Sequence, residues 1–495
     1  MRTHLAPLLV CLTWPALAVA DDAPARPNVV FILADDLGYT DLACQGSRYY
    51  ESPNVDRMAA EGLRFTEGYT CGPNCQPTRA ALMSGQYGPR TGVYTVGHID
   101  RFNWRTRSLR PVENVQNLPL DKVTLAQSLR RAGYATALFG KWHLGQQGEY
   151  HPSARGFDEA VVSMGRHFDF VTTPPTDTPP GTYLADFLTG KAVDFITRSK
   201  DRPFFLALHH FGVHSPYEAK KELIERFQDK PQAGGHRDPT YAAMIASVDE
   251  SVGRILKTLD DLKLGEKTLV IFTSDNGGVG GYTRAGLKKT GEITDNAPLR
   301  GGKGMLYEGG VRVPYIFRWP GQIPAGGTCD RPINSVDLYP TLLEVAGARA
   351  PEGYPLDGLS YLGLLTGQGG RGRTASEALF WHFPGYLGAG ADSWRTTPAG
   401  AIRSGDWKLI EFFEDGRREL YNLRDDVGET DDLAAKRPEK LKELHDRLVA
   451  WRSLIHAPMP SPHTPEPAAA KKKAAARKKA ARAKVDALDD PGEER

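Results

Sequence analysis

The 495-residue sequence has few cysteines, almost no net charge and no long apolar run. Five cysteines exclude a small disulfide-stapled scaffold, and 62 Lys and Arg against 60 Asp and Glu exclude a histone-like polycation. A hydrophobic share of 40% excludes a disordered acidic chain, and 52 glycines fall far short of the about one-third of a collagen. A globular protein remains, long enough for two to four folding units of roughly 150 residues each.

The net charge of +2 hides an uneven distribution. Residues 471–484 carry eight basic groups and no acid, whereas residues 485–495 carry five acids and one Arg. Allowing also for Arg2, residues 21–470 have a net charge of −3. This mildly acidic body offers no overall basic face, so we expect no nucleic-acid binding by it. We interpret the basic tail as a solvated extension, with contact to an anionic polymer or surface as the alternative.

The first twenty residues are typical of an export signal. Arg2 supplies the positive start, residues 5–17 are largely apolar, and Ala18-Val19-Ala20 offers a small-residue cleavage site. The apolar run is shorter than the roughly 18–20 residues that span a bilayer, and no later segment reaches that length. We therefore expect a signal peptide over 1–20, an exported protein that is periplasmic or secreted, and no membrane span.

Removal of that signal would leave an even number of cysteines. Cys11 leaves with the signal, and the remaining thiols are Cys44, Cys71, Cys75 and Cys329. An oxidising compartment would normally pair four such thiols into two disulfides.

Short apolar segments alternate with helical patterns from residue 27 onward. Residues 28–36, 203–211 and 268–278 are compact apolar runs typical of buried parallel strands, and residues 311–319 add another. Helical spacing follows Thr124 and stops at Gly133, and it also covers residues 241–264 before Gly265. Strands separated by helices predict an α/β fold, with a large mixed, mostly parallel sheet between helices, over residues 27–370.

The pattern changes at the Gly-rich residues 367–373. Strand-like runs at 378–383, 401–413 and 417–423 are separated by turns, and an amphipathic helix pattern covers 438–454. We expect a smaller C-terminal α+β subdomain over residues 375–457, with an antiparallel sheet and a closing helix. From residue 458 to 495 the Pro-rich and then Ala/Lys/Arg-rich composition predicts a disordered tail.

Two strand candidates end in oxygen-bearing side chains. Asp35 and Asp36 close the first run, and Asp275 and Asn276 close the run at 268–278. One acidic pair at a strand end is usually a solvated turn, but carboxyl ends of parallel strands meet at one edge of a sheet. Four hard oxygen-bearing side chains there suit Ca²⁺ or Mg²⁺ better than a thiophilic metal.

Residues 71–87 carry the most specific motif. Cys75-Gln76-Pro77-Thr78-Arg79 has the form CxPxR and continues to Leu82 and Ser84-Gly85. This string resembles the signature of the type I, formylglycine-dependent sulfatases, arylsulfatase-like members of the alkaline phosphatase superfamily. Cys71 also begins CxP but has no Arg at the fifth position. The resemblance implies an alkaline-phosphatase-like fold and oxidation of Cys75 to formylglycine (3-oxoalanine) by a formylglycine-generating enzyme.

Further matching strings follow in the order of that family and extend the resemblance over about residues 27–455. Lys141 and His143 lie in GKWHLG, His214 in FGVHSPY, and Lys303 in LRGGKGMLYEGGVRVP. Taken singly, each would pass for an ordinary surface lysine or loop histidine. The resemblance implies a Ca²⁺ ion, with Mg²⁺ possible, at one set of residues: Asp35, Asp36, Asp275, Asn276 and the modified Cys75.

The resemblance also implies how a sulfate ester would be cleaved. One hydroxyl of the hydrated aldehyde attacks sulfur and displaces the alcohol, and the second then expels sulfate; a plain Ser lacks the second hydroxyl. Arg79 steadies the diol, Lys141 contacts sulfate, and His143 is the base for the second step. His214 is our preferred general acid at the leaving oxygen, with Lys303 assisting.

Two positions depart from the common family pattern. Thr78 stands where Ser is commoner, which leaves modification of Cys75 plausible. Ser215-Pro216-Tyr217 follows His214 where many relatives have a second His, which bears on the substrate more than on the reaction.

The motifs do not identify the alcohol that carries the sulfate. The expected substrate is a sulfated small molecule or polysaccharide. Candidate sugar contacts are His98, Arg101, Trp104, His167, Tyr282, Arg284, Trp394 and Arg395. The basic, aromatic stretch that holds Arg101, Trp104, Arg105 and Arg107 is suited to an anionic sugar chain.

Three other functions stay open at this point. One is a phosphonate or phosphate-diester hydrolase of the same superfamily, which turnover of nitrophenyl sulfate against the diester analogue would separate. Another is a non-catalytic exported binding protein, against which the intact set of catalytic residues argues. The third is nucleic-acid binding by residues 471–484 alone. Conversion of Cys75 to an aldehyde would leave three thiols and room for one disulfide at most.

Overall fold

Eight strands form the central sheet of the computed structural model, which describes residues 26–288, 292–369, 377–390 and 393–466. Strands β8, β1, β7, β5 and β6 run parallel, and β9 is antiparallel to both β8 and β2. This confirms a mixed, mostly parallel sheet. In spatial order the strands are β10 (Gly327–Cys329), β2 (Leu63–Phe65), β9 (Tyr315–Arg318), β8 (Thr268–Ser274), β1 (Asn28–Ala34), β7 (Phe204–His209), β5 (Ala135–Gly140) and β6 (Glu159–Val162).

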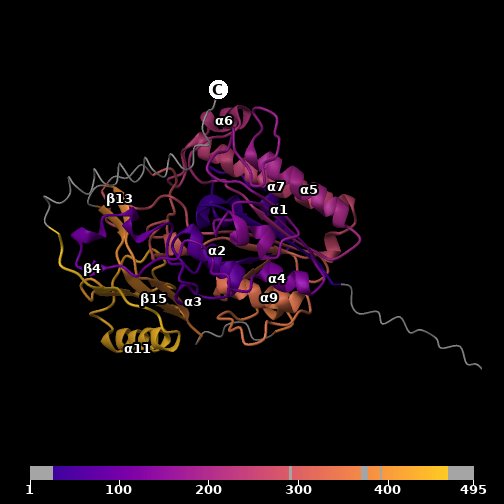
Figure 1. Ribbon diagram of the computed structural model, residues 1–495. Coiled ribbons are helices and arrows are strands. Elements are labelled where there is room, and N and C mark those ends of the chain that lie inside the picture. The colour runs from indigo at the N-terminus through magenta and orange to yellow at the C-terminus, as the bar shows by residue number, and fades with distance from the viewer. Residues whose placement is uncertain (1–25, 289–291, 370–376, 391–392, 467–495) are drawn as a thin grey trace, which may run out of the picture.

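Helices cover both faces of this sheet, which explains why its central strands read as continuous apolar runs. Val30 and Ile32 of β1 point to one face, and Val29 and Phe31 point to the other. The first face packs against α1 (Pro53–Ala60), α5 (Leu184–Ser199), α6 (Lys221–Gln228) and α7 (Pro239–Asp261). The second packs against α2 (Cys75–Ser84), α4 (Leu125–Arg131), α9 (Leu338–Val345) and α10 (Leu362–Leu365), so the two helical layers lie on opposite sides (Figure 1).

One predicted helix boundary agrees with the structure, and another differs from it. At α4, Thr124 caps the helix as predicted, because its hydroxyl accepts from the Gln127 amide while the Gln127 side chain accepts from the Thr124 amide. Helix α7 ends at Asp261 and not at Gly265. Lys263 takes the left-handed conformation (φ 56°) that would have suited a glycine, so Gly265 instead begins a short 3-10 turn.

A four-stranded antiparallel sheet follows, as predicted, in the order β12 (Leu379–Phe383), β15 (Ala399–Ser404), β16 (Trp407–Phe412) and β17 (Arg418–Asn422). Helix α11 (Pro438–Leu454) covers one face, where Trp451 stacks on Phe380 at 4.6 Å between ring centroids. The other face meets the main sheet region, where Trp381 lies edge-on to Tyr69. A hairpin of β13 (Leu387–Gly390) and β14 (Ser393–Thr396) was not expected from the sequence.

The predicted disorder from residue 458 is wrong for the start of that segment. Strand β18 (Ser461–Pro462) pairs antiparallel with β4 (Leu109–Arg110), and the His463 ring lies 5.0 Å from that of Trp104. Residues 467–495 and the predicted signal over 1–20 lie outside the described residues.

The remaining short elements are β3 (Gly68–Tyr69), paired with β11 (Ile333–Asn334), and the helices α3 (Gly88–Thr91) and α8 (Glu308–Val311). No helix within the described ranges combines the length and apolar character needed to cross a membrane. No disulfide within the described ranges involves the four cysteines expected to remain after signal removal: Cys44, Cys71, Cys75 and Cys329.

Candidate active site

The candidate site lies where four adjacent parallel strands end. Strand β1 runs into Asp35 and Asp36, and its neighbour β8 runs into Asp275 and Asn276, with Ala34 and Ser274 in register. On the other side, β5 leads into Lys141 and β7 leads to the loop that carries His214. Carboxyl ends of parallel strands are the usual place for ligands in such sheets.

The oxygen-bearing side chains from β1 and β8 meet as the sequence predicted. The Asn276 amide donates to Asp36 Oδ1 at 2.9 Å, and the Asp36 backbone amide donates to Asp275 Oδ1 at 3.2 Å. Asp36 has a left-handed backbone (φ 64°), an uncommon conformation that turns its side chain toward this cluster. All four side chains are buried: Asp35, Asp36, Asp275 and Asn276.

Two lysines form ion pairs with Asp35 and Asp36. Lys141 Nζ is 2.5 Å from Asp35 Oδ2, and Lys303 Nζ is 2.6 Å from an Asp36 oxygen. Burial opposes ionisation of Asp36, but Lys303, His214 and Lys141 together hold its pKa well below the usual range. Burial alone would lower the pKa of Lys303, but the negative charge of Asp36 outweighs burial and raises this pKa above the usual range. Both lysines therefore stay charged at neutral pH.

Cys75 is the first residue of α2 and faces these charges. Its side chain is buried, and burial raises the pKa of the thiol to about 12, so the unmodified residue is a neutral thiol at neutral pH. One turn on, Arg79 donates from Nε to Asp275 Oδ2 at 2.8 Å and from Nη1 to the Lys141 carbonyl at 2.5 Å. Arg79 thus links α2 to β8 and β5.

Two histidines complete the predicted set. His143 has a left-handed backbone (φ 63°), and its Nδ1 is buried with no hydrogen-bond partner among the described residues. Burial and the charges of Lys141 and Arg79 lower the pKa of His143 well below its usual value. His214 Nε2 lies 3.7 Å from Asp36 Oδ2, and burial lowers its pKa to about 4. Both imidazoles are therefore neutral at pH 7 when no substrate is bound.

Several groups that hold this set in place carry no recognisable sequence signal. His209, the last residue of β7, makes a 3.2 Å hydrogen bond from Nδ1 to the Lys141 carbonyl. Phe211 lies beneath both Lys141 Nζ, at 5.6 Å, and the His214 ring, at 5.0 Å. A glycine is required before Lys141, because a Cβ on Gly140 would lie 1.9 Å from the His209 carbonyl oxygen. These contacts join distant segments, so no local pattern records them.

The candidate sugar contacts divide into two groups. Most already have internal partners: Trp104 is buried and donates to Asp100, His167 bonds to the His214 carbonyl, and Arg284 pairs with Asp295. His98 pairs with Asp100, and Trp394 packs on Phe102. Arg105 and Arg107, from the stretch suited to an anionic chain, are ion-paired with Asp100 and Glu414. The others are Tyr282, which donates to the Lys303 carbonyl and contacts the Arg395 guanidinium, and Arg101, which donates to the Val96 carbonyl.

The oxygen donors fit a hard divalent cation. Asp35 Oδ1 and Asn276 Oδ1 are buried and have no hydrogen-bond partner within the described ranges. Ligand atoms of Asp35, Asp36, Cys75 and His214 all lie within 4.8 Å of one another. Carboxylate and amide oxygens around a buried point are the ligands that Ca²⁺ and Mg²⁺ prefer.

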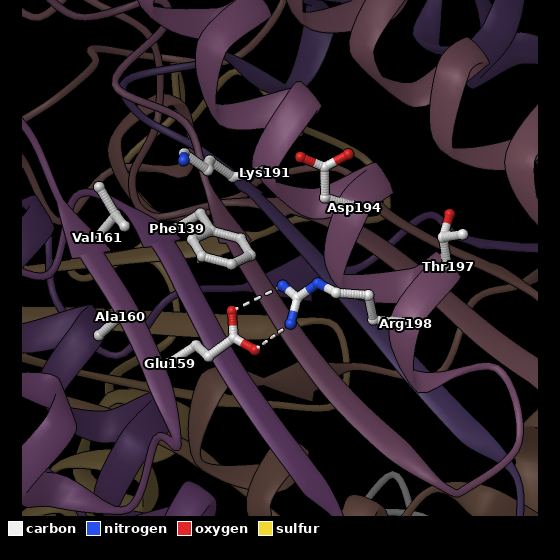
Figure 2. Close-up of a pocket in the computed structure, with 8 residues that line it drawn as sticks. All are labelled: Phe139, Glu159, Ala160, Val161, Lys191, Asp194, Thr197 and Arg198. Atoms are coloured by element: carbon white, nitrogen blue, oxygen red, sulfur yellow. Dashed lines mark hydrogen bonds and ion pairs between the residues drawn. The ribbon is translucent and has the colours of Figure 1, made fainter. Parts of the chain in front are cut away.

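A surface hollow elsewhere in the molecule does not compete with this site. It has a volume of about 590 Å³ between β6, at the edge of the sheet, and α5, and contains none of the predicted site residues (Figure 2). Its most prominent charges, on Glu159 and Arg198, neutralise each other in a two-bond ion pair at 2.8 and 2.9 Å.

Comparison with known proteins decides the family. A family model described as Sulfatase matches residues 27–348. The chain belongs to the sulfatase family. A second model, for the C-terminal part of N-sulphoglucosamine sulphohydrolase, matches residues 302–453 of this sulfatase. The predicted enzyme class, a sulfatase that hydrolyses sulfate esters, is confirmed.

Several relatives cover most of the sulfatase. A protein described as a sulfatase from Formosa agariphila is 35% identical, with 88% of this chain and 90% of that protein covered. N-acetylgalactosamine-6-sulfatase from Homo sapiens is 34% identical, with 73% and 69% covered. The crystal structure of Ps i-CgsB in complex with k-i-k-neocarrahexaose superposes with a TM-score of 0.72 at 28% identity, covering 86% of this chain and 92% of that one. The alkaline-phosphatase-like fold is thereby confirmed.

Proposed function

We propose that this sulfatase cleaves sulfate monoesters of carbohydrates through formylglycine made from Cys75, with a divalent cation held beside it. The observation that carries the proposal is the position of Cys75, at the start of α2 and against the Asp35, Asp36 and Lys141 cluster. A buried neutral thiol is a weak nucleophile, whereas the hydrated aldehyde supplies an attacking hydroxyl and a second hydroxyl for sulfate release.

The charge balance of the site supports an anionic substrate. Three acids, Asp35, Asp36 and Asp275, face three bases, Arg79, Lys141 and Lys303, so the side chains alone are close to neutral. We propose that Ca²⁺, or Mg²⁺, is held by Asp35, Asp36, Asp275, Asn276 and the modified Cys75. When bound, such a cation would supply positive charge to the site and would favour ionisation of the nucleophile. The site would then have the positive surplus that a sulfate ester requires.

Each remaining residue has a role that follows from its contacts. Arg79, fixed by Asp275 and the Lys141 carbonyl, orients the side chain at position 75. Lys141 and Lys303 are charged and bind sulfate oxygens. His143 is a neutral imidazole with a free ring nitrogen among the described groups, and it accepts the proton in the release step.

His214 and Lys303 are proposed to bracket the leaving oxygen, and one of them protonates the departing alcohol. His214 shares Asp36 with Lys303, which brings both side chains to the same side of the cluster. Burial keeps the His214 pKa at about 4 without substrate, and the added negative charge of a bound sulfate raises the pKa of this imidazole. His214 is thus the acid we favour, and Lys303 stabilises the charge that develops on the leaving oxygen.

The substrate class and location are proposed from relatives. The compared proteins include an N-acetylgalactosamine-6-sulfatase and a structure bound to a neocarrahexaose, both of which concern sugars. We propose a sulfated sugar or polysaccharide as substrate, and export to the periplasm or medium. Maturation would need a formylglycine-generating enzyme in the host.

Turnover and peptide mass together test the proposed function. Protein from its native host should release sulfate from nitrophenyl sulfate much faster than it cleaves the corresponding phosphate diester. Mass spectrometry of the peptide that contains Cys75 should find the aldehyde. An unmodified thiol in active protein would contradict the nucleophile, and preference for the diester would favour the phosphonate or phosphodiester hydrolase. Unmodified, inactive protein would favour a binding protein.

Metal removal should inactivate and destabilise the protein. Ca²⁺ added back to chelated protein should restore sulfate release and raise the melting temperature, because a ligand at about 100 times its Kd adds about 2.7 kcal/mol of stability. Asp36→Asn should abolish this shift. Asp260→Asn, which changes a surface acid paired with Arg57 and Arg318, should retain it. Equal shifts in the two variants would place the ion elsewhere.

A further inference from the structure

Arg395, beside the candidate site, lacks the carboxylate partner that nearby arginines have among the described residues. Arg105, Arg107 and Arg284 each have a carboxylate partner. Arg395 has no ion pair within the described part of the chain, and its Nε is buried there without a hydrogen-bond partner. The side chain as a whole is half-buried. A guanidinium that lacks a carboxylate counter-ion is suited to an anionic ligand.

Strand β14 aims Arg395 toward the reaction centre. Successive side chains on a strand point to opposite faces. Trp394 packs on Phe102, at 6.3 Å between rings, whereas the Arg395 guanidinium lies 4.6 Å from the centre of the Tyr282 ring. Tyr282 donates from its hydroxyl to the Lys303 carbonyl at 3.0 Å. Arg395 is therefore one side chain away from a residue that brackets the leaving oxygen.

Gly304 brings Arg395 still closer. This glycine has φ +91°, and a Cβ there would lie 3.1 Å from Arg395 Cδ and 2.3 Å from a Leu387 methyl. Only a glycine lets the arginine lie against this backbone without displacing it. The Gly304 amide donates to the Pro73 carbonyl at 2.6 Å, two residues before Cys75. The arginine thus packs on the segment that joins Lys303 to the nucleophile loop.

Arg101 is connected to the same loop through residues 95 and 96. Its Nη1 donates to the Val96 carbonyl at 3.2 Å, and the preceding residue, Thr95, accepts from the Asn74 side chain at 2.9 Å. Arg101 is exposed, and its guanidinium lies over Phe102, the ring that contacts Trp394. Partial burial lowers the Arg101 pKa, and the charge of Arg395 acts in the same direction, as expected for two guanidinium groups near each other.

We propose that Arg101 and Arg395 bind a second anionic group of the substrate, a carboxylate or sulfate on the alcohol that is released. This rests on the proposed function, since it assigns the alcohol side of the same site. The substrate class is then a sugar that carries at least two negative charges. Lys303 and His214 meet the ester that reacts, while the two arginines meet the neighbouring anion.

Sugar binding to a protein that cannot turn over tests this directly. In a Cys75→Ala background, affinity is measured by calorimetry for three sugars. One is singly charged, N-acetylgalactosamine 6-sulfate; one has a second sulfate on that sugar; and one has a glucuronate linked to it. Wild-type arginines should favour a doubly charged sugar, and Arg395→Gln should weaken its binding about 10- to 100-fold more than that of the singly charged sugar. Comparison of the two doubly charged sugars shows whether the second anionic group that binds is a carboxylate or a sulfate.

Two variants separate recognition from folding. Arg395→Lys keeps the charge and should retain part of the preference. Arg105→Gln removes a guanidinium already paired with Asp100, and the preference should be unchanged. Equal weakening of all three sugars by Arg395→Gln, no weakening, or no preference for either doubly charged sugar would overturn the proposal. These outcomes leave sulfate release from nitrophenyl sulfate untouched, so they are distinct from failure of the proposed function.

Discussion

Replacing Cys75 by Ser should reduce steady-state sulfate release at least about a thousandfold, because a serine supplies only one hydroxyl. That hydroxyl can take the sulfuryl group and release the alcohol once. The resulting ester has no neighbouring hydroxyl to expel sulfate, so the enzyme stays sulfated. Arg79, Lys141 and Lys303 remain to stabilise the transfer, which makes one turnover feasible.

Intact-protein mass and product release measure this outcome together. At most one alcohol per protein should appear, with a mass gain of one sulfuryl group that persists after substrate is removed. Cys71→Ser is the matched control, because this neighbouring cysteine is also buried and approaches Asn334 Oδ1, at 2.5 Å, outside the acidic cluster. Its turnover should stay near wild type. Sustained turnover by Cys75→Ser would refute the two-hydroxyl mechanism.

The central part of the site was predictable because it depends on local sequence. A buried strand followed by polar side chains predicts both the strand and the sheet edge at which those side chains lie. Asp35 and Asp36 follow β1 in this way, and Asp275 follows β8. CxPxR likewise puts Cys75 and Arg79 one turn apart on a single helix. Both predictions can be made without knowledge of tertiary contacts.

Other features depend on contacts between distant segments, and composition alone misled there. The stretch around Trp104 looked open to an anionic chain, yet Asp100 and Glu414 already neutralise Arg105 and Arg107. Residues 461–462 looked disordered because their composition is Pro-rich, yet strand β4 offers them an edge to pair with. The role proposed for Arg395 likewise depends on Gly304, which no periodicity connects to β14.

Replacing Lys408 by Met should cost about 3–5 kcal/mol in the free energy of unfolding. Lys408 is fully buried on β16, and its Nζ lies 2.9 Å from Glu308 of α8 and 2.9 Å from Glu429 after β17. It therefore joins the C-terminal sheet to the main sheet region. Met fills a similar space but leaves Glu429 without its cation beside Glu308, which keeps its ion pair with Arg312, and removal of one partner from a buried ion cluster is strongly destabilising.

The pH dependence of that loss distinguishes charge from packing. In the wild-type protein Glu308 has its pKa lowered to about 2, since Lys408, Arg312 and Arg403 together outweigh burial, whereas burial raises the pKa of Glu429 to about 7. Without Lys408 the pKa of Glu429 rises still further above that of the unfolded chain, while Arg312 and Arg403 continue to lower that of Glu308. Protonation then favours the folded state, so the deficit of the variant should shrink as pH falls from about 8 to about 5.

Urea unfolding at the two pH values, followed by circular dichroism, measures this difference. Lys436→Met is the control, because the Lys436–Asp431 pair is exposed and its removal should change stability little at either pH. A deficit in Lys408→Met that is the same at both pH values would mean that lost packing, and not uncompensated charge, destabilises the variant. A deficit no larger than that of Lys436→Met would mean that this buried lysine does not hold the C-terminal sheet in place.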